Sequence, residues 1–118
     1  CIEKVEADAV REKLIEQNVF IKQMLVQLTG KKSLKSIQTF KGKGCGVCHQ
    51  SGYHGRVGVF EVLIVDEPIR EAIMAHKNAD EIRELALKSK MTTMVYDGLR
   101  KMLAGETTLE EILRVTKE

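Results

Sequence analysis

The chain has 118 residues, enough for one compact domain with a small appendage and too few for a large multidomain enzyme. Hydrophobic residues make up 43% and charged residues 31%, a balance typical of globular proteins rather than disordered tails. The net charge of +2 does not indicate a nucleic-acid partner, and no segment approaches the roughly 18 uninterrupted apolar residues that a membrane span needs. We therefore expect no nucleic-acid partner and no direct membrane insertion.

The charge is unevenly distributed along the chain. Residues 17–60 contain no Asp or Glu, and their basic residues are Lys22, Lys31, Lys32, Lys35, Lys41, Lys43 and Arg56. Such a run is typical of a solvated basic face. It also fits a region that compensates for negative charge, either on its own metal-bound thiolates or on an anionic partner.

Two helices and a short strand are predicted before the glycine-rich part of the chain. Asp8 is the expected N-cap of the first helix, which ends near Asn18. The second helix is expected over Val19–Leu28, and residues 37–41 are expected to form the strand. In the second of these segments, the spacing of Phe20, Met24 and Leu28 at i, i+4 and i+8 is typical of a helix.

The next segment has the features of a metal site. Six of the nine glycines lie between Gly42 and Gly58, around the pair Cys45-Gly46-Val47-Cys48. Two cysteines at this spacing can both bind one zinc ion, and the glycines leave backbone N–H groups free to bond the sulfurs. The odd number of cysteines, three, disfavours a structural disulfide.

Two other chemistries share this pattern. With His49, the pair matches the covalent haem c attachment motif, which would need a second axial ligand such as Met74 or Met91 and an apolar pocket. A redox Cys-x-x-Cys site is expected at a helix N-terminus, which the following glycines oppose. Gly30-Lys31-Lys32-Ser33 lacks the spacing of a phosphate loop, so the chain offers no nucleotide site.

The remaining sequence predicts one strand and then helices. Residues 56–65 are apolar on both faces, as in a strand that lies inside a sheet. Four helices are expected after it. Their N-terminal signals are Asp66 with Pro68, Asn78 with Glu81, Thr93, and a full capping box formed by Thr108 with Glu111.

Several of these motifs together resemble one family, the secretion ATPase superfamily that includes the type IV pilus assembly and type II secretion motors. The resemblance is carried by four stretches, namely Gly42–Leu63, Met91–Met94, Asp97–Lys101 and Ala104–Thr116. In that family these are the last motifs of the polypeptide. The resemblance therefore implies a C-terminal fragment of a RecA-like P-loop ATPase.

The resemblance implies an α+β, mostly helical fold in three parts. Residues 1–55 would be a cysteine (zinc) subdomain truncated at its N-terminus, residues 56–65 a strand of the ATPase core, and residues 66–118 a C-terminal helical subdomain. Extension motors of this family bind structural zinc through two Cys-x-x-Cys pairs. On that alignment the metal ligands here are Cys1, Cys45 and Cys48.

The resemblance also implies a function. The parent would be a cytoplasmic homo-hexamer, peripheral to the inner membrane through a platform protein, that uses ATP and Mg²⁺ to power pilus assembly or protein secretion. This part would contain no catalytic residue and would be inactive alone. The alternatives are a non-catalytic zinc module that binds an anionic partner, and a small haem c protein that uses Cys45, Cys48 and His49.

Overall fold

The computed structural model describes residues 2–6, 19–30 and 37–116. Two short strands, β1 (Ile2–Glu6) and β2 (Gln38–Gly42), form an antiparallel ribbon in which Ile2 lies opposite Gly42. Helix α2 spans Val19–Thr29, and four more helices follow the ribbon: α3 (Glu67–Met74), α4 (Ala79–Lys88), α5 (Met94–Leu103) and α6 (Leu109–Thr116). The expected mostly helical α+β composition is confirmed.

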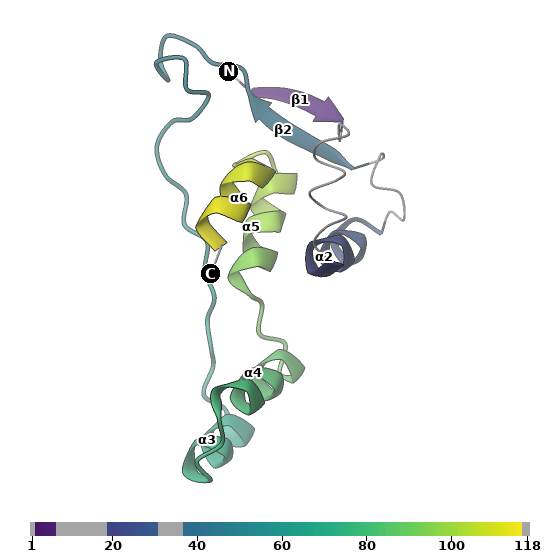
Figure 1. The fold of residues 1–118 in the computed structure, drawn as a ribbon, viewed down its shortest axis with the longest axis vertical. Helices are drawn as coiled ribbons and strands as arrows, with labels where there is room; N and C mark the ends of the chain where they lie inside the picture. The colour runs from purple at the N-terminus through teal and green to yellow at the C-terminus, as the bar shows by residue number, and fades with distance from the viewer. Residues whose placement is uncertain (1, 7–18, 31–36, 117–118) are drawn as a thin grey trace.

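The described elements form two groups joined by extended chain. In Figure 1, the ribbon, α2, α5 and α6 lie together at one end, and α3 and α4 lie at the other. The molecule measures 55 × 32 × 21 Å, and its radius of gyration of 17.1 Å exceeds the value of about 13.5 Å expected for a compact chain of this length. None of the helices in the described ranges is long and apolar enough to cross a membrane.

The hydrophobic core belongs to the group that contains α5. Its buried side chains come from α2, the residue before β2, α5 and α6: Ile21, Leu25, Ile37, Leu99, Met102, Leu109 and Ile112. The predicted helix over Val19–Leu28 is confirmed as α2, in which Ile21 and Leu25 are buried while Phe20 is 72% exposed. Met24 and Leu28 flank this stripe and pack against the core only in part.

The predicted helix starts after residue 65 are confirmed. The Asp66 carboxylate accepts the N–H of Ile69 at 3.2 Å, and Thr93 Oγ1 accepts the N–H of Tyr96 at 3.2 Å. Asn78 and Glu81 form a complete capping box, with bonds of 2.9 and 3.1 Å. These local bonds satisfy amide donors that have no partner within their own helix. The predicted helix that begins at Asp8 lies outside the described residues.

The predicted strand over residues 56–65 is not formed. This segment runs as extended chain from the cysteine-containing turn toward α3 (Figure 1), and none of its residues belongs to a sheet. A strand needs the backbone of a neighbour for its hydrogen bonds, and no other strand in the described ranges lies beside it. Most of its large apolar side chains are exposed, among them Phe60 at 65%, Val62 at 66% and Ile64 at 75%, whereas Val59 is half-buried against the core.

Side chains of α5 hold this extended segment instead. Asp97 Oδ2 accepts the backbone N–H of Phe60 at 3.0 Å and pairs with Lys101 Nζ at 2.9 Å, and the same ammonium donates to the Gly58 carbonyl. The Glu61 carboxylate accepts the N–H of Met94 at 3.0 Å, in the first turn of α5. The hydrogen bond from Lys101, followed by that from Phe60, lowers the pKa of Asp97. The Asp97-to-Lys101 motif therefore has a structural role here.

We predict that the isolated chain associates with itself through residues 57–65. Burying one exposed Val side chain in a partner recovers about 1.5–3 kcal/mol, and the segment offers several on an extended backbone that belongs to no sheet. Val62→Lys should weaken this association, whereas Leu87→Lys, at an exposed apolar position on α4, should not. Light scattering over a range of concentrations measures the effect, and a wild-type chain that stays monomeric throughout would contradict the prediction.

Candidate functional site: the cysteine turn

Cys45 and Cys48 lie in a tight turn that follows the end of β2 at Gly42. The Gln50 N–H donates to the Cys45 carbonyl at 2.9 Å and closes the turn. His49 and Gln50 have φ values of 51° and 64°, which residues other than glycine seldom adopt. The chain therefore reverses within a few residues and brings Cys48 back over Cys45, as the Cys-x-x-Cys spacing predicts.

The sulfur atoms of Cys45 and Cys48 are 3.3 Å apart, well beyond the S–S bond length of about 2.05 Å, so the two cysteines are not joined to each other by a disulfide. The backbone N–H groups of Cys45 and Gly52 donate to the Cys48 sulfur at 3.1 and 3.4 Å. Burial of Cys48 raises its pKa, but the hydrogen bonds from Cys45 and from nearby backbone amides outweigh this effect and lower the pKa to about 7. At neutral pH a substantial fraction of Cys48 is therefore thiolate, the form that binds metals and reacts with electrophiles.

This donor set fits two of the four positions of a zinc site. Two sulfurs that bind tetrahedral zinc at about 2.3 Å lie about 3.8 Å apart, so only a small opening of the turn is needed. Within the described ranges, no third Cys, His, Asp or Glu lies where it could bind the same metal ion as the pair. His49 and His54 are therefore not additional ligands in this arrangement. Cys1, the third predicted ligand, lies outside those ranges. The structure thus brings together Cys45 and Cys48 and leaves the rest of the set as a prediction.

The haem c alternative gains no support from the arrangement. Met74, one of the two proposed axial ligands, lies in α3 and is 76% exposed. Cys45, Cys48 and His49 instead follow β2, in the other group of elements. His49 itself is exposed. A haem would need an apolar pocket around both axial ligands, which these positions do not provide.

Gly42 and Gly52 allow the backbone of the turn to pack directly against the end of β2. A Cβ added to Gly52 would lie 2.9 Å from the Cα of Gly42, and one added to Gly42 would lie 2.6 Å from the Cα of Gly52 and overlap its carbonyl oxygen. Gly52 also has a φ of +79°. The high glycine content is therefore a packing requirement at this crossing, where two backbones touch.

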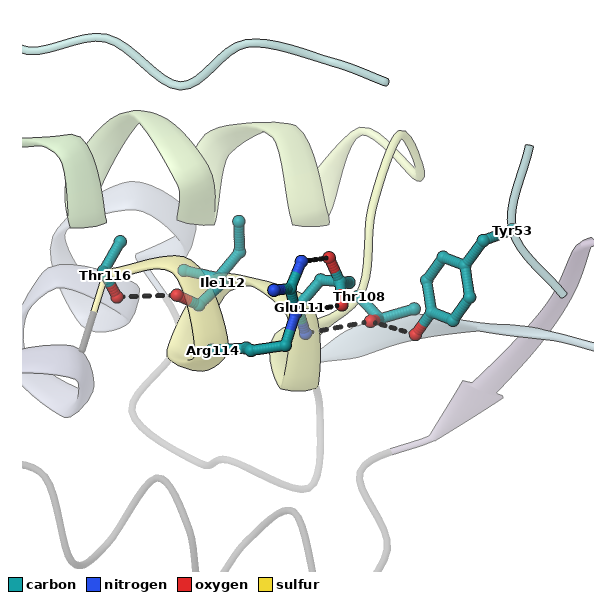
Figure 2. A network of polar contacts seen from close by, with 6 residues as sticks. All are labelled: Tyr53, Thr108, Glu111, Ile112, Arg114 and Thr116. Atoms are coloured by element: carbon teal, nitrogen blue, oxygen red, sulfur yellow. Dashed lines mark hydrogen bonds and ion pairs between the residues drawn. The ribbon is translucent and has the colours of Figure 1, made fainter. Parts of the chain in front are cut away.

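The turn also forms one wall of an open cavity of about 580 Å³. The residues that line this cavity include Cys48, Tyr53 and Arg56, residues 105–108 and part of α6. Two of them, Tyr53 and Thr108, are far apart in the sequence, yet the Tyr53 hydroxyl lies 2.8 Å from Thr108 Oγ1 (Figure 2). No local sequence signal identifies this pair, because only the tertiary fold brings the turn to the start of α6.

The capping box predicted at α6 is only half formed. Thr108 Oγ1 accepts the N–H of Glu111 at 3.3 Å, as expected. The Glu111 carboxylate does not return to the Thr108 backbone but binds the Arg114 guanidinium with two contacts of 2.8 Å (Figure 2). This pairing lowers the pKa of Glu111 and raises that of Arg114. A charge-assisted bidentate pair is stronger than one bond to a neutral amide, which explains the difference.

Comparison with known proteins identifies the family of this chain. A family model described as type II/IV secretion system protein matches residues 5–114, a stretch that includes the cysteine turn, helices α2 to α5 and residues 109–114 of α6. The chain belongs to this family. The resemblance inferred from the motifs alone is confirmed.

Curated relatives agree with this assignment. The chain is 47% identical over 85 residues to the type IV pilus assembly ATPase PilB of Thermus thermophilus, an alignment that covers 72% of this chain and 10% of that protein. It is 34% identical over 119 alignment positions to the type II secretion system ATPase E of Vibrio cholerae, which covers 100% of this chain and 20% of that protein. The chain thus spans between one tenth and one fifth of the length of these two relatives.

We predict that Gly42→Ala destabilises the chain by about 1–3 kcal/mol, because the added methyl group cannot fit against the Gly52 backbone. Gly46→Ala is the matched control, since a Cβ there meets nothing within 4 Å. Urea unfolding of the two variants and the wild type measures the difference. Equal stability of both variants would show that the Gly42–Gly52 crossing tolerates a side chain.

Proposed function

We propose that this chain is the C-terminal zinc-binding and helical region of a hexameric cytoplasmic ATPase that powers type IV pilus assembly or type II protein secretion. The observation that carries the proposal is the match to the family over residues 5–114, with curated relatives named as ATPases of both systems. The whole protein would act as a homo-hexamer. It would be peripheral to the inner membrane through a platform protein.

In this proposal the chain supports the motor and does not perform the chemistry. ATP and Mg²⁺ would bind to the part of the protein that carries a phosphate loop, a motif absent from these 118 residues. The region would contribute the cysteine (zinc) subdomain at residues 1–55, which contains the cysteine turn, the extended segment at 56–65 and the helical subdomain at 66–118. The exposed apolar side of the extended segment is consistent with a place against a larger core.

For the metal site, we propose that Cys1, Cys45 and Cys48 are structural zinc ligands. Two observations support this set: the Cys45 and Cys48 sulfurs are 3.3 Å apart, and Ile2, the neighbour of Cys1 in sequence, pairs with Gly42 three positions before Cys45. The family resemblance implies a fourth ligand from a cysteine of the preceding sequence. When bound, zinc would hold the ribbon and the turn in one arrangement.

A non-catalytic zinc module that binds an anionic partner remains a second candidate. It is favoured by the exposed basic side chains Lys22, Lys41, Lys43 and Arg56, in a part of the chain without acidic residues. The two candidates differ in what the whole protein does, because only the motor hydrolyses ATP. They share the zinc site.

The ATPase proposal is tested by comparing this chain with the whole protein. We expect millimolar ATP and Mg²⁺ to leave the melting temperature of the 118-residue chain unchanged, whereas the whole protein should hydrolyse ATP. Differential scanning fluorimetry and phosphate release measure the two effects. A clear upward shift for the chain alone would reveal a nucleotide site within it, and a whole protein without turnover would favour the binding module.

Zinc binding should depend on both described cysteines. We expect the wild-type chain to bind zinc more weakly than the whole protein, because it supplies three thiolates, and the Cys45→Ser/Cys48→Ser variant to lose it. Metal analysis after gel filtration measures the zinc content. Ser89→Ala, at the C-terminal end of α4 and in the other group of elements, leaves all three cysteines in place and is the control. Stoichiometric zinc in the double variant would reject the assigned ligands.

A further inference from the structure

We infer that the cysteine turn and the start of α6 act as one unit, so that zinc held by the turn stabilises α6 through the hydrogen bond between Tyr53 and Thr108. The inference takes its ligand from the proposed zinc site. The path of hydrogen bonds is a property of the chain itself, and it can be tested with or without a metal.

The first part of this path runs from the Cys48 backbone and sulfur to Tyr53. Ser51 Oγ donates to the Cys48 carbonyl at 2.6 Å and accepts the Tyr53 N–H at 3.1 Å. Gly52, between them, donates its N–H to the Cys48 sulfur at 3.4 Å and is held against β2. The residues that position the Cys48 sulfur therefore also position the Tyr53 backbone. A change in the geometry of the sulfurs must move Tyr53 or break one of these bonds.

The second part runs from Tyr53 into α6. Thr108 is only 6% exposed, and its hydroxyl oxygen contacts both the Tyr53 hydroxyl at 2.8 Å and the Glu111 N–H at 3.3 Å (Figure 2). This hydroxyl caps α6, which has only eight residues and therefore gains much of its stability from its first turn and its packing. Tyr53 fixes the position of the cap, and the cap fixes the helix.

The third part is the packing that depends on α6. Its buried residues Leu109 and Ile112 belong to the hydrophobic core, and Ile112 lies so close to Gly98 that a Cβ there would be 2.7 Å from its Cδ1. Loss of the first turn of α6 would therefore loosen the contact between α5 and α6. By thermodynamic linkage, any ligand that fixes the turn stabilises α6, and an intact α6 strengthens binding at the turn by the same factor.

Amide hydrogen exchange of residues 109–116 in the 118-residue chain tests the inference. We expect zinc to slow exchange there in the wild type, and Tyr53→Phe to reduce this slowing by about 2- to 12-fold, the effect of losing one hydrogen bond. Tyr96→Phe is the matched control, since it removes the other tyrosine hydroxyl and leaves the Tyr53–Thr108 pair in place. Metal analysis confirms that each variant still carries zinc.

The outcomes separate this inference from the zinc proposal. Equal slowing in wild type and Tyr53→Phe, or zinc binding with no slowing at all, would overturn the inference while the zinc site stands. If the wild type binds no zinc, the zinc proposal fails and alkylation of Cys45 and Cys48 replaces the metal as the perturbation. Alkylation should then speed exchange at residues 109–116 in the wild type and Tyr96→Phe but not in Tyr53→Phe, and the same response in all three would overturn the inference.

Discussion

Helix α5 is the element on which the rest of the described structure depends. One face packs against α2, β2 and α6 and carries Leu99 and Met102, both fully buried. Another side carries Asp97 and Lys101, which bind the backbone of the extended segment. Gly98 has no side chain, and this allows Ile112 of α6 to approach the backbone of α5 closely. One helix thus provides apolar packing, a polar clamp and a close helix contact at the same time.

The cysteine turn is stabilised by backbone contacts more than by side-chain packing. Gly42 and Gly52 touch, amide groups point at the Cys48 sulfur, and Ser51 links the turn to Tyr53. The hydrogen bonds of the chain itself hold the two sulfurs close together, which reduces the conformational entropy that metal binding must overcome. Burial raises the pKa of Cys48, but the hydrogen bond from the Cys45 side chain and those from the nearby amides outweigh it and lower the pKa to about 7. The short distance between the sulfurs and the lowered pKa of Cys48 both favour binding of a cation at this turn.

The two groups of elements differ in how well they are buried. The α5-centred group contains the core, whereas α3 and α4 pack mainly on each other and contribute few buried side chains, such as Ile69 and Ala86. Between them runs the extended segment with its exposed Val, Leu and Ile side chains. The chain matches only a tenth to a fifth of the length of the two curated relatives, so most of the sequence of those relatives has no counterpart in these 118 residues.

The sequence alone determined the local features and the family. The caps at Asp66, Asn78 and Thr93, the short strand near residue 38 and the turn at Cys45–Cys48 depend on neighbouring residues, so their patterns could be read directly. The polar stretch at Ile2–Glu6 gave no strand signal, because it becomes a strand only by pairing with β2. For the same reason residues 56–65, whose apolar pattern is typical of a strand, do not form one here, because no other strand pairs with them in the described ranges. The Tyr53–Thr108 bond and the preference of Glu111 for Arg114 were likewise decided by tertiary contacts, since they depend on distances that no local pattern contains.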